Sequence, residues 1–317
     1  MSAIAGLNFG PVDLSKEQIF QCVLGSCPDQ ISQMVIWQVR LPRVLVALVA
    51  GMGLAIAGAI LQNTTRNPLA DPYLFGIISG AGLGATVANI SLTSIGLGEQ
   101  LDIALPLAAF LGALFAIAIV LIIAKVLQRM EQLLLTGVAV SFMLAAITHF
   151  ILYFGEPFAT NRVIFWLMGS LSRVEMNNFF VISSVLLISL FIILAFHRHI
   201  DALLLGDESA ASLGVNADKL RLLMLGLCAA LTATIVAYCG GIGFVGLMIP
   251  HIVRQVIGVT TLKLVIGSAL IGGIFLIWVD IIARTALANA EIPIGIITSA
   301  LGSIFFLFIM VKTRNNH

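Results

Sequence analysis

Charge is scarce in this sequence. Of its 317 residues only 10% are Asp, Glu, Lys or Arg, and 16 basic against 15 acidic side chains give a formal net charge of +1. A water-soluble domain of this length needs far more polar surface, and a nucleic-acid-binding protein needs an excess of basic residues. Both classes are therefore excluded. Hydrophobic residues make up 60% of the chain and its mean hydropathy is +1.11, which is typical of a polytopic membrane protein.

Cysteine is also rare, and no metal-binding spacing is present. The four cysteines are Cys22, Cys27, Cys228 and Cys239, and none belongs to the paired CxxC pattern of a zinc site. Cys228 and Cys239 lie in one apolar helical run, too far apart to bridge. Cys22 and Cys27 could form a small extracytoplasmic disulfide, although unpaired thiols are the simpler interpretation. We expect no metal site.

A nucleotide-hydrolysing motif is missing as well. No GxxxxGK[ST] occurs, so the chain cannot hydrolyse ATP through a P-loop. The stretch Gly241-Ile-Gly-Phe-Val-Gly246 matches GxGxxG as a string, but an apolar helical run precedes it and Pro250 follows it. Tight helix packing is the better interpretation of these glycines. We therefore expect no enzymatic activity and no cofactor, with energy supplied by another subunit or an ion gradient.

What the sequence does contain is nine apolar runs. The predicted spans are residues 42–62, 73–96, 103–127, 132–153, 176–196, 217–239, 243–258, 262–286 and 292–311. Helices are predicted for all of them, because open sheets are not stable in lipid. The predicted fold class is all-α: a polytopic helical membrane protein with about nine transmembrane helices, forming one domain over residues 1–317. A short interfacial helix is expected within residues 156–172.

The distribution of Lys and Arg predicts the orientation in the membrane. Ten of these side chains fall on one side of the alternating spans and six on the other. Because the richer side is normally cytoplasmic, residues 1–38 are predicted to be an extracytoplasmic segment and residues 197–221 a cytoplasmic loop. Two short helices are expected in that loop, one ending at Gly206 and one capped by Asp207 and ending at Gly214.

Few ionisable residues lie inside the predicted spans. The candidates are His149, His251 and Asp280. Asp280 stands four residues before Arg284 on one helix face, so we expect these two charges to pair. A secondary transporter driven by an ion gradient would need such groups near mid-membrane. That function is an alternative with weak support from these residues.

Two cations mark the outer end of the first predicted span. In Arg40-Leu-Pro-Arg43 the arginines are three residues apart and share a helix face at the boundary where positive charge is disfavoured. Such a pair suits an acidic partner protein. It equally suits anchoring to lipid headgroups, and the residues alone leave both interpretations open.

Several motifs occur together in one order. They are Arg40-Leu-Pro-Arg43, Thr65-Arg-Asn-Pro-Leu-Ala-Asp-Pro72, Gly76-Ile-Ile-Ser-Gly-Ala-Gly82, residues 202–214, Gly241 to Arg254, Asp280-Ile-Ile-Ala-Arg284 and Glu291-Ile-Pro-Ile-Gly295. From about residue 35 to its end, the chain resembles the FecCD-type transmembrane subunits of type II ABC importers. These permeases take up iron siderophores, haem and cobalamin.

The resemblance implies an assembly as well as a fold. Its members are homodimers of ten-helix subunits in the bacterial inner membrane, with two cytoplasmic ATPase subunits and a periplasmic or lipid-anchored substrate-binding protein. The expected cargo is a metal chelate, a ferric siderophore or haem, with cobalamin or molybdate as alternatives. The family's first helix precedes a segment like residues 7–24, so a truncated start is favoured over a nine-helix protein.

The resemblance also implies roles for individual residues. Arg40, Arg43 and Arg284 match the arginines that receive acidic residues of the binding protein, so reversing the charges of Arg40 and Arg43 is expected to leave folding intact and to remove stimulation of the ATPase. A cytoplasmic gate falls at Met130 and Glu131. The residues expected to couple to the ATPase are Ala202, Leu203, Leu204, Leu205, Gly206, Asp207, Glu208, Ser209, Ala210, Leu213 and Gly214.

Overall fold

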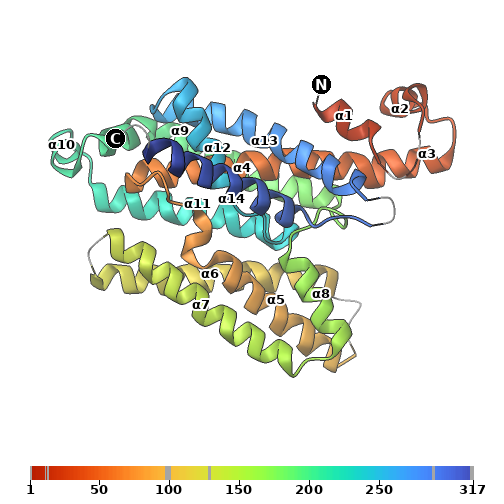
Figure 1. Cartoon of the computed structure of the whole chain (residues 1–317), viewed down its shortest axis with the longest axis horizontal. Coiled ribbons are helices and arrows are strands. Elements are labelled where there is room, and N and C mark those ends of the chain that lie inside the picture. The colour runs from red at the N-terminus through yellow and green to blue at the C-terminus, as the bar shows by residue number, and fades with distance from the viewer. Residues whose placement is uncertain are drawn as a thin grey trace.

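A computed structural model describes residues 2–10, 12, 14–96, 101–127, 130–287 and 290–314, and every regular element in those ranges is a helix (Figure 1). The all-α prediction is confirmed for this part of the chain. The elements are α1 (Ser2–Asn8), α2 (Lys16–Val23), α3 (Gln30–Met34), η1 (Val35–Arg40), α4 (Leu41–Thr65), η2 (Pro72–Phe75), α5 (Ile77–Ser94), α6 (Leu101–Leu127), α7 (Met130–Tyr153), α8 (Pro157–Leu167), α9 (Met176–Leu204), α10 (Asp207–Ser212), α11 (Ala217–Cys239), α12 (Val245–Ile257), α13 (Thr261–Thr285) and α14 (Ile294–Arg314).

The membrane-spanning helices agree with the predicted runs. Within the described residues, seven helical stretches are long and apolar enough to cross a bilayer, and two shorter apolar helices accompany them at Val245–Ile257 and Ile294–Ile309. Each overlaps one of the nine predicted runs. Helix α12, with 13 residues, falls below the usual length of a lipid-exposed span. The chain is therefore a multi-pass membrane protein in which α12 depends on protein neighbours.

The first span begins earlier than the sequence predicts. The chain is helical without a break from Gln30 to Thr65, whereas the predicted run starts at residue 42. The apolar run starts after the charged Arg40, but the helix itself continues back through Pro42, whose ring normally collides with the preceding turn. Here the preceding turn is a π-helix, in which the N–H of Leu41 bonds to the carbonyl of Ile36. The wider turn accommodates the proline and keeps the chain helical.

Helix α4 is the centre of the bundle. It packs against α9, α11, α12 and α13, and most of its residues are buried. Two glycines allow the closest approaches, since a Cβ atom at Gly51 would collide with the carbonyl of Gly272, and one at Gly58 with the carbonyl of Gly246. The tight helix packing predicted for the glycines between residues 241 and 246 is thereby confirmed at Gly246.

The helices form two groups that share contacts through α11. One group contains α5 to α8 and the other contains α4, α9 and α11 to α14 (Figure 1). Helix α11 packs on α5 and α6 as well as on α4 and α9. The short helix α10 lies at one end of the molecule and α1 to α3 lie at the other. We call these the inner and outer ends, because the sequence predicts them to be cytoplasmic and extracytoplasmic.

Two predictions about short helices have different outcomes. The expected interfacial helix within residues 156–172 is α8. In the 197–221 loop, however, there is one short helix rather than two, because α9 continues to Leu204 and α10 follows after Gly206. No Gly or Pro interrupts residues 197–204, and the end of α9 is held by buried Ile200 and Leu203. Gly206, not Asp207, is the residue before the first turn of α10.

The structure joins Cys22 to Cys27, so the expectation of unpaired thiols is wrong for this pair. Helix α2 ends next to Cys22, and Gly25 with φ of 87° turns the chain back. This reversal brings the two Cα atoms to 4.1 Å. Cys228 and Cys239 are free and buried, as expected.

Candidate functional site

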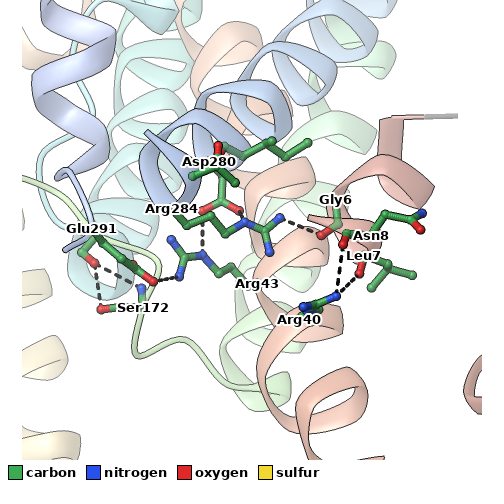
Figure 2. Close-up of polar contacts among 12 residues, drawn as sticks. Gly6, Leu7, Asn8, Arg40, Arg43, Ser172, Asp280, Arg284 and Glu291 are labelled. Carbon is green, nitrogen blue, oxygen red and sulfur yellow. Dashed lines mark hydrogen bonds and ion pairs between the residues drawn. The ribbon is translucent and has the colours of Figure 1, made fainter. Parts of the chain in front are cut away.

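Three predicted site residues meet at the outer end in a cluster of charges. We call Arg40, Arg43, Asp280, Arg284 and Glu291 the outer cluster (Figure 2). Nε of Arg43 lies 2.7 Å from Oδ1 of Asp280, and its Nη1 lies 2.9 Å from Oε1 of Glu291. Nε of Arg284 is 3.3 Å from Oδ2 of Asp280. The predicted pairing of Asp280 with Arg284 is confirmed, and Arg43 joins it from α4.

Backbone carbonyls near the start of the chain complete this cluster. Nη1 of Arg40 donates to the carbonyl of Leu7 at 2.6 Å and to that of Asn8 at 3.3 Å, and its Nη2 donates to the carbonyl of Val12. Nη2 of Arg284 donates to the carbonyl of Gly6 at 2.7 Å. Gly6, Leu7 and Asn8 therefore lie next to the two guanidinium groups (Figure 2), and their carbonyls, with that of Val12, act as hydrogen-bond acceptors in place of carboxylates.

The outer cluster is buried, which the sequence did not predict. Arg40 is 2% exposed, Arg43 and Arg284 are 5% exposed and Asp280 is 1% exposed. Only the side chain of Glu291 reaches solvent substantially, at 39%. A buried ion pair that loses or reverses one member leaves an uncompensated charge. The expectation that charge reversal at Arg40 and Arg43 leaves folding intact is therefore at odds with this burial.

Glu291 is a member of the cluster that sequence reasoning missed. The sequence motif Glu291-Ile-Pro-Ile-Gly295 contains it but does not indicate its role. Its position could have indicated a partner for Arg43, because Glu291 is the only acidic residue between Asp280 and the end of the sequence and is predicted on the same side of the membrane as Arg43. An acid so placed next to an unpaired arginine is a candidate partner.

The predicted coupling segment lies at the inner end and is divided between buried and exposed residues. Ala202 and Leu203 are buried at the end of α9, and Ala210 is buried in α10. Leu205 and Leu213 are 68% and 63% exposed. The exposed or partly exposed members are Leu204, Gly206, Asp207, Glu208, Ser209 and Gly214. The segment thus presents two apolar side chains and several polar ones away from the bundle.

The predicted gate is not tested by the structure. Met130 and Glu131 begin α7, and their side chains lie outside the described part of the chain. Their assignment stays a prediction.

A cavity of about 690 Å³ lies between the two groups of helices. It is lined by the loop after α4, the end of α8, the loop between α11 and α12 and the start of α14. Its lining is mostly apolar, with Asp71, Tyr73 and Ser299 as polar members. Asp71 is 7% exposed, and its Oδ1 accepts a hydrogen bond from the N–H of Tyr73 at 2.8 Å. Burial raises the pKa of Asp71 to about 6.

Comparison with known proteins shows where this helical arrangement belongs. A model of the FecCD transport family matches residues 1–312. The chain belongs to the FecCD transport family. This membership confirms the resemblance drawn from the motifs, and this FecCD protein is accordingly a transport permease.

Known proteins are similar to this FecCD protein over most of its length. A cobalamin import system permease of Halobacterium salinarum is 38% identical over 89% of this chain and 74% of the relative. A hemin transport system permease of Yersinia pestis is 35% identical over 98% of this chain and 92% of the relative. A solved inward-facing transporter assigned to the metal-chelate type of ABC transporters matches with a TM-score of 0.86 and 32% identity, over 98% of this chain and 95% of the other. The PsaBC structure from Streptococcus pneumoniae, at 15% identity and a TM-score of 0.60, shares the fold over 92% of this chain and 94% of the other.

Proposed function

We propose that this chain is the membrane permease of a binding-protein-dependent ABC importer that carries a metal chelate such as a ferric siderophore or haem. The observation that carries this proposal is the family match over residues 1–312, together with the fold shared with a metal-chelate type transporter. The hemin permease of Yersinia pestis supports haem as cargo. The cobalamin permease of Halobacterium salinarum favours a second candidate, cobalamin, carried by the same machinery.

The proposed assembly is a homodimer in the plasma membrane with two cytoplasmic ATPase subunits and an extracytoplasmic binding protein. ATP is bound by the ATPase subunits, in keeping with the lack of a P-loop in this chain. Residues 202–214 contact the ATPase, which is supported by the exposed Leu205 and Leu213 at the inner end. ATP then drives alternating access, in which the coupling segment moves as a rigid body and the helices change which side is open.

The binding protein is proposed to dock at the outer cluster through Arg40, Arg43 and Arg284. Charges at a docking interface contribute to recognition and to the association rate. In the structure, the guanidinium groups already bond to internal carbonyls and carboxylates. Docking by them therefore requires acidic groups of the binding protein to exchange with the carbonyls of residues 6–8 and 12 or with Glu291.

The test is uptake by the reconstituted complex. The chain, its cognate ATPase and its cognate binding protein are placed in vesicles, and accumulation of haemin, a ferric siderophore and cyanocobalamin is measured with and without ATP. We expect ATP-dependent accumulation of one chelate and none by the chain alone. Accumulation by the chain alone under a proton gradient contradicts the proposal and favours a secondary transporter.

A further inference from the structure

Helix α10 has little packing of its own to fix its orientation. It has six residues, of which only Ala210 is buried. Glycines with positive φ stand on both sides of it, Gly206 at 107° and Gly214 at 78°, and glycine permits backbone rotations that other residues resist. An isolated helix of this length is not stable in water. Interactions from other elements must therefore hold α10 against the bundle.

The carboxylate of Asp207, at the start of α10, provides these interactions. Arg221 on α11 donates two hydrogen bonds to it, Nη2 to Oδ1 at 2.6 Å and Nη1 to Oδ2 at 3.0 Å. Arg66, directly after α4, donates from Nη2 to Oδ1 at 2.9 Å. Bidentate pairs of this kind are strong and directional. We call Asp207, Arg66 and Arg221 the Asp207 clamp.

The clamp reaches the central helix α4 in two ways. Nε of Arg221 donates to the carbonyl of Thr64, in the last turn of α4, at 3.1 Å. Arg66 is itself the residue that ends α4, with a left-handed φ of 52°. The side chain of Arg221 is only 11% exposed, whereas that of Asp207 is 49% exposed. The guanidinium group is thus fixed in the bundle, while the carboxylate belongs to the exposed segment.

The carboxylate of Asp207 is ionised at neutral pH. The hydrogen bonds from Arg221 lower its pKa, and the nearby charges of Arg221 and Arg66 act in the same direction. The other described charges close to this group are Asp218, 3.9 Å from Nη1 of Arg221, and Glu208, the next residue along α10. The clamp is therefore intact under the conditions of transport.

We propose that the Asp207 clamp makes α10 and the inner end of α4 move as one body, so that Asp207 and Arg221 are positioning residues for energy coupling. This inference rests on the proposed function, because it takes α10 as the contact with the ATPase. Without the clamp, α10 can turn about Gly206 and Gly214, and a displacement imposed on it is only partly delivered to α4. Hydrolysis then continues with less transport for each ATP consumed.

The chain offers a matched control for Asp207. Asp218 also lies in the first turn of a helix and also faces Arg221, but at 3.9 Å and with a side chain that is 99% exposed. Replacing either aspartate by asparagine removes one negative charge near a helix N-terminus, where it is favourable. Only Asp207→Asn removes a bond between α10 and the rest of the bundle.

The experiment measures haemin or cyanocobalamin molecules accumulated per ATP hydrolysed by the full complex in vesicles. We expect Asp207→Asn to lower this ratio about threefold, which corresponds to the small free energy of a partly exposed ion pair. The ATPase should still co-purify with the variant. Asp207→Glu keeps the carboxylate and should restore most of the ratio. Asp218→Asn should leave it at the wild-type value.

Three results would overturn the inference. If Asp207→Asn accumulates as many molecules per ATP as the wild type, the inference about the clamp is wrong and the proposed function is unaffected. Loss of ATPase co-purification in Asp207→Asn also overturns it, because the carboxylate then binds the ATPase directly instead of positioning α10. A wild-type complex in which ATP drives no accumulation of either probe overturns the proposed function, and the clamp with it.

Discussion

The two ends of α4 carry similar ion pairs in opposite surroundings. At the outer end, Arg43 contacts Asp280 at 2.7 Å, and their side chains are 6% and 1% exposed. At the inner end, Arg66 contacts Asp207 at 2.9 Å, and their side chains are 42% and 49% exposed. The distances hardly differ, so the interactions are distinguished by their access to water.

This difference indicates what each end can do. Breaking a buried pair leaves a charge without water or a counter-ion, which is costly. An exposed pair contributes about 1 kcal/mol or less, because water replaces either partner. The outer cluster is therefore suited to holding α4, α13 and residues 6–8 and 12 in the one geometry on which folding depends, whereas the inner contacts can fix the orientation of α10 while adding little to the stability of the fold.

The largest expected effect on stability is that of Arg43→Gln. The substitution takes the guanidinium group from both Asp280 and Glu291, and we expect it to lower the free energy of unfolding by about 3–5 kcal/mol. Thermal unfolding of the purified protein in detergent measures this loss. Arg43→Lys should recover part of it, since lysine keeps the charge but not the two-point geometry.

A melting temperature of Arg43→Gln equal to that of the wild type would show that water reaches the outer cluster. It would also restore the expectation that charges there can be changed without harm to the fold. Binding-protein docking could then be tested by simple charge reversal.

An intermediate effect on the free energy of unfolding is expected at Asp71. This residue is at the inner end of α4 but is buried, so it shows whether burial or the side of the membrane determines the effect of a charge. Asp71 follows the inner end of α4 but is 7% exposed, and burial raises its pKa from 3.8 to about 6. Because the folded pKa is the higher one, proton binding stabilises the folded state at low pH, and this contribution is lost as pH rises through about 6.

Asp71→Asn removes that pH dependence and keeps an oxygen for the N–H of Tyr73. At pH 8 the variant should be more stable than the wild type by about 3 kcal/mol, and the difference should shrink towards pH 4. Melting temperatures at both pH values check this, with the exposed Asp218→Asn as control. An equal difference at the two pH values would mean that the carboxylate of Asp71 is hydrated.

Much of the fold could be predicted because its signals are local. Nine apolar runs mark the helices, and the glycines between residues 241 and 246 mark where α12 meets α4. The π-turn before Pro42 was missed because proline ordinarily ends a helix. The disulfide between Cys22 and Cys27 was only the less favoured alternative, because spacing alone does not show that Gly25 turns the chain back on itself.

The candidate sites were predicted less completely, because motifs give positions and not surroundings. Arg43 and Asp280 are 237 residues apart in sequence, and only the packing of α4 on α13 joins them. Asp207 was expected in the coupling segment, yet its partners come from the ends of two other helices. Burial of the outer arginines depends on backbone carbonyls of residues 6–8 and 12, which no side-chain motif can reveal.

The smallest expected effect is that of Arg66→Gln, the same chemical change as Arg43→Gln at the other end of the same helix. Arg221 still holds Asp207 through two hydrogen bonds, and water replaces the lost contact, so we expect a loss of about 0.5 kcal/mol or less. The two variants are compared by thermal unfolding in one detergent. If Arg66→Gln destabilises the protein as much as Arg43→Gln does, then exposure to water does not determine the strength of these pairs. The buried outer cluster and the water-exposed contacts of Asp207 would then contribute equally to the stability of the fold.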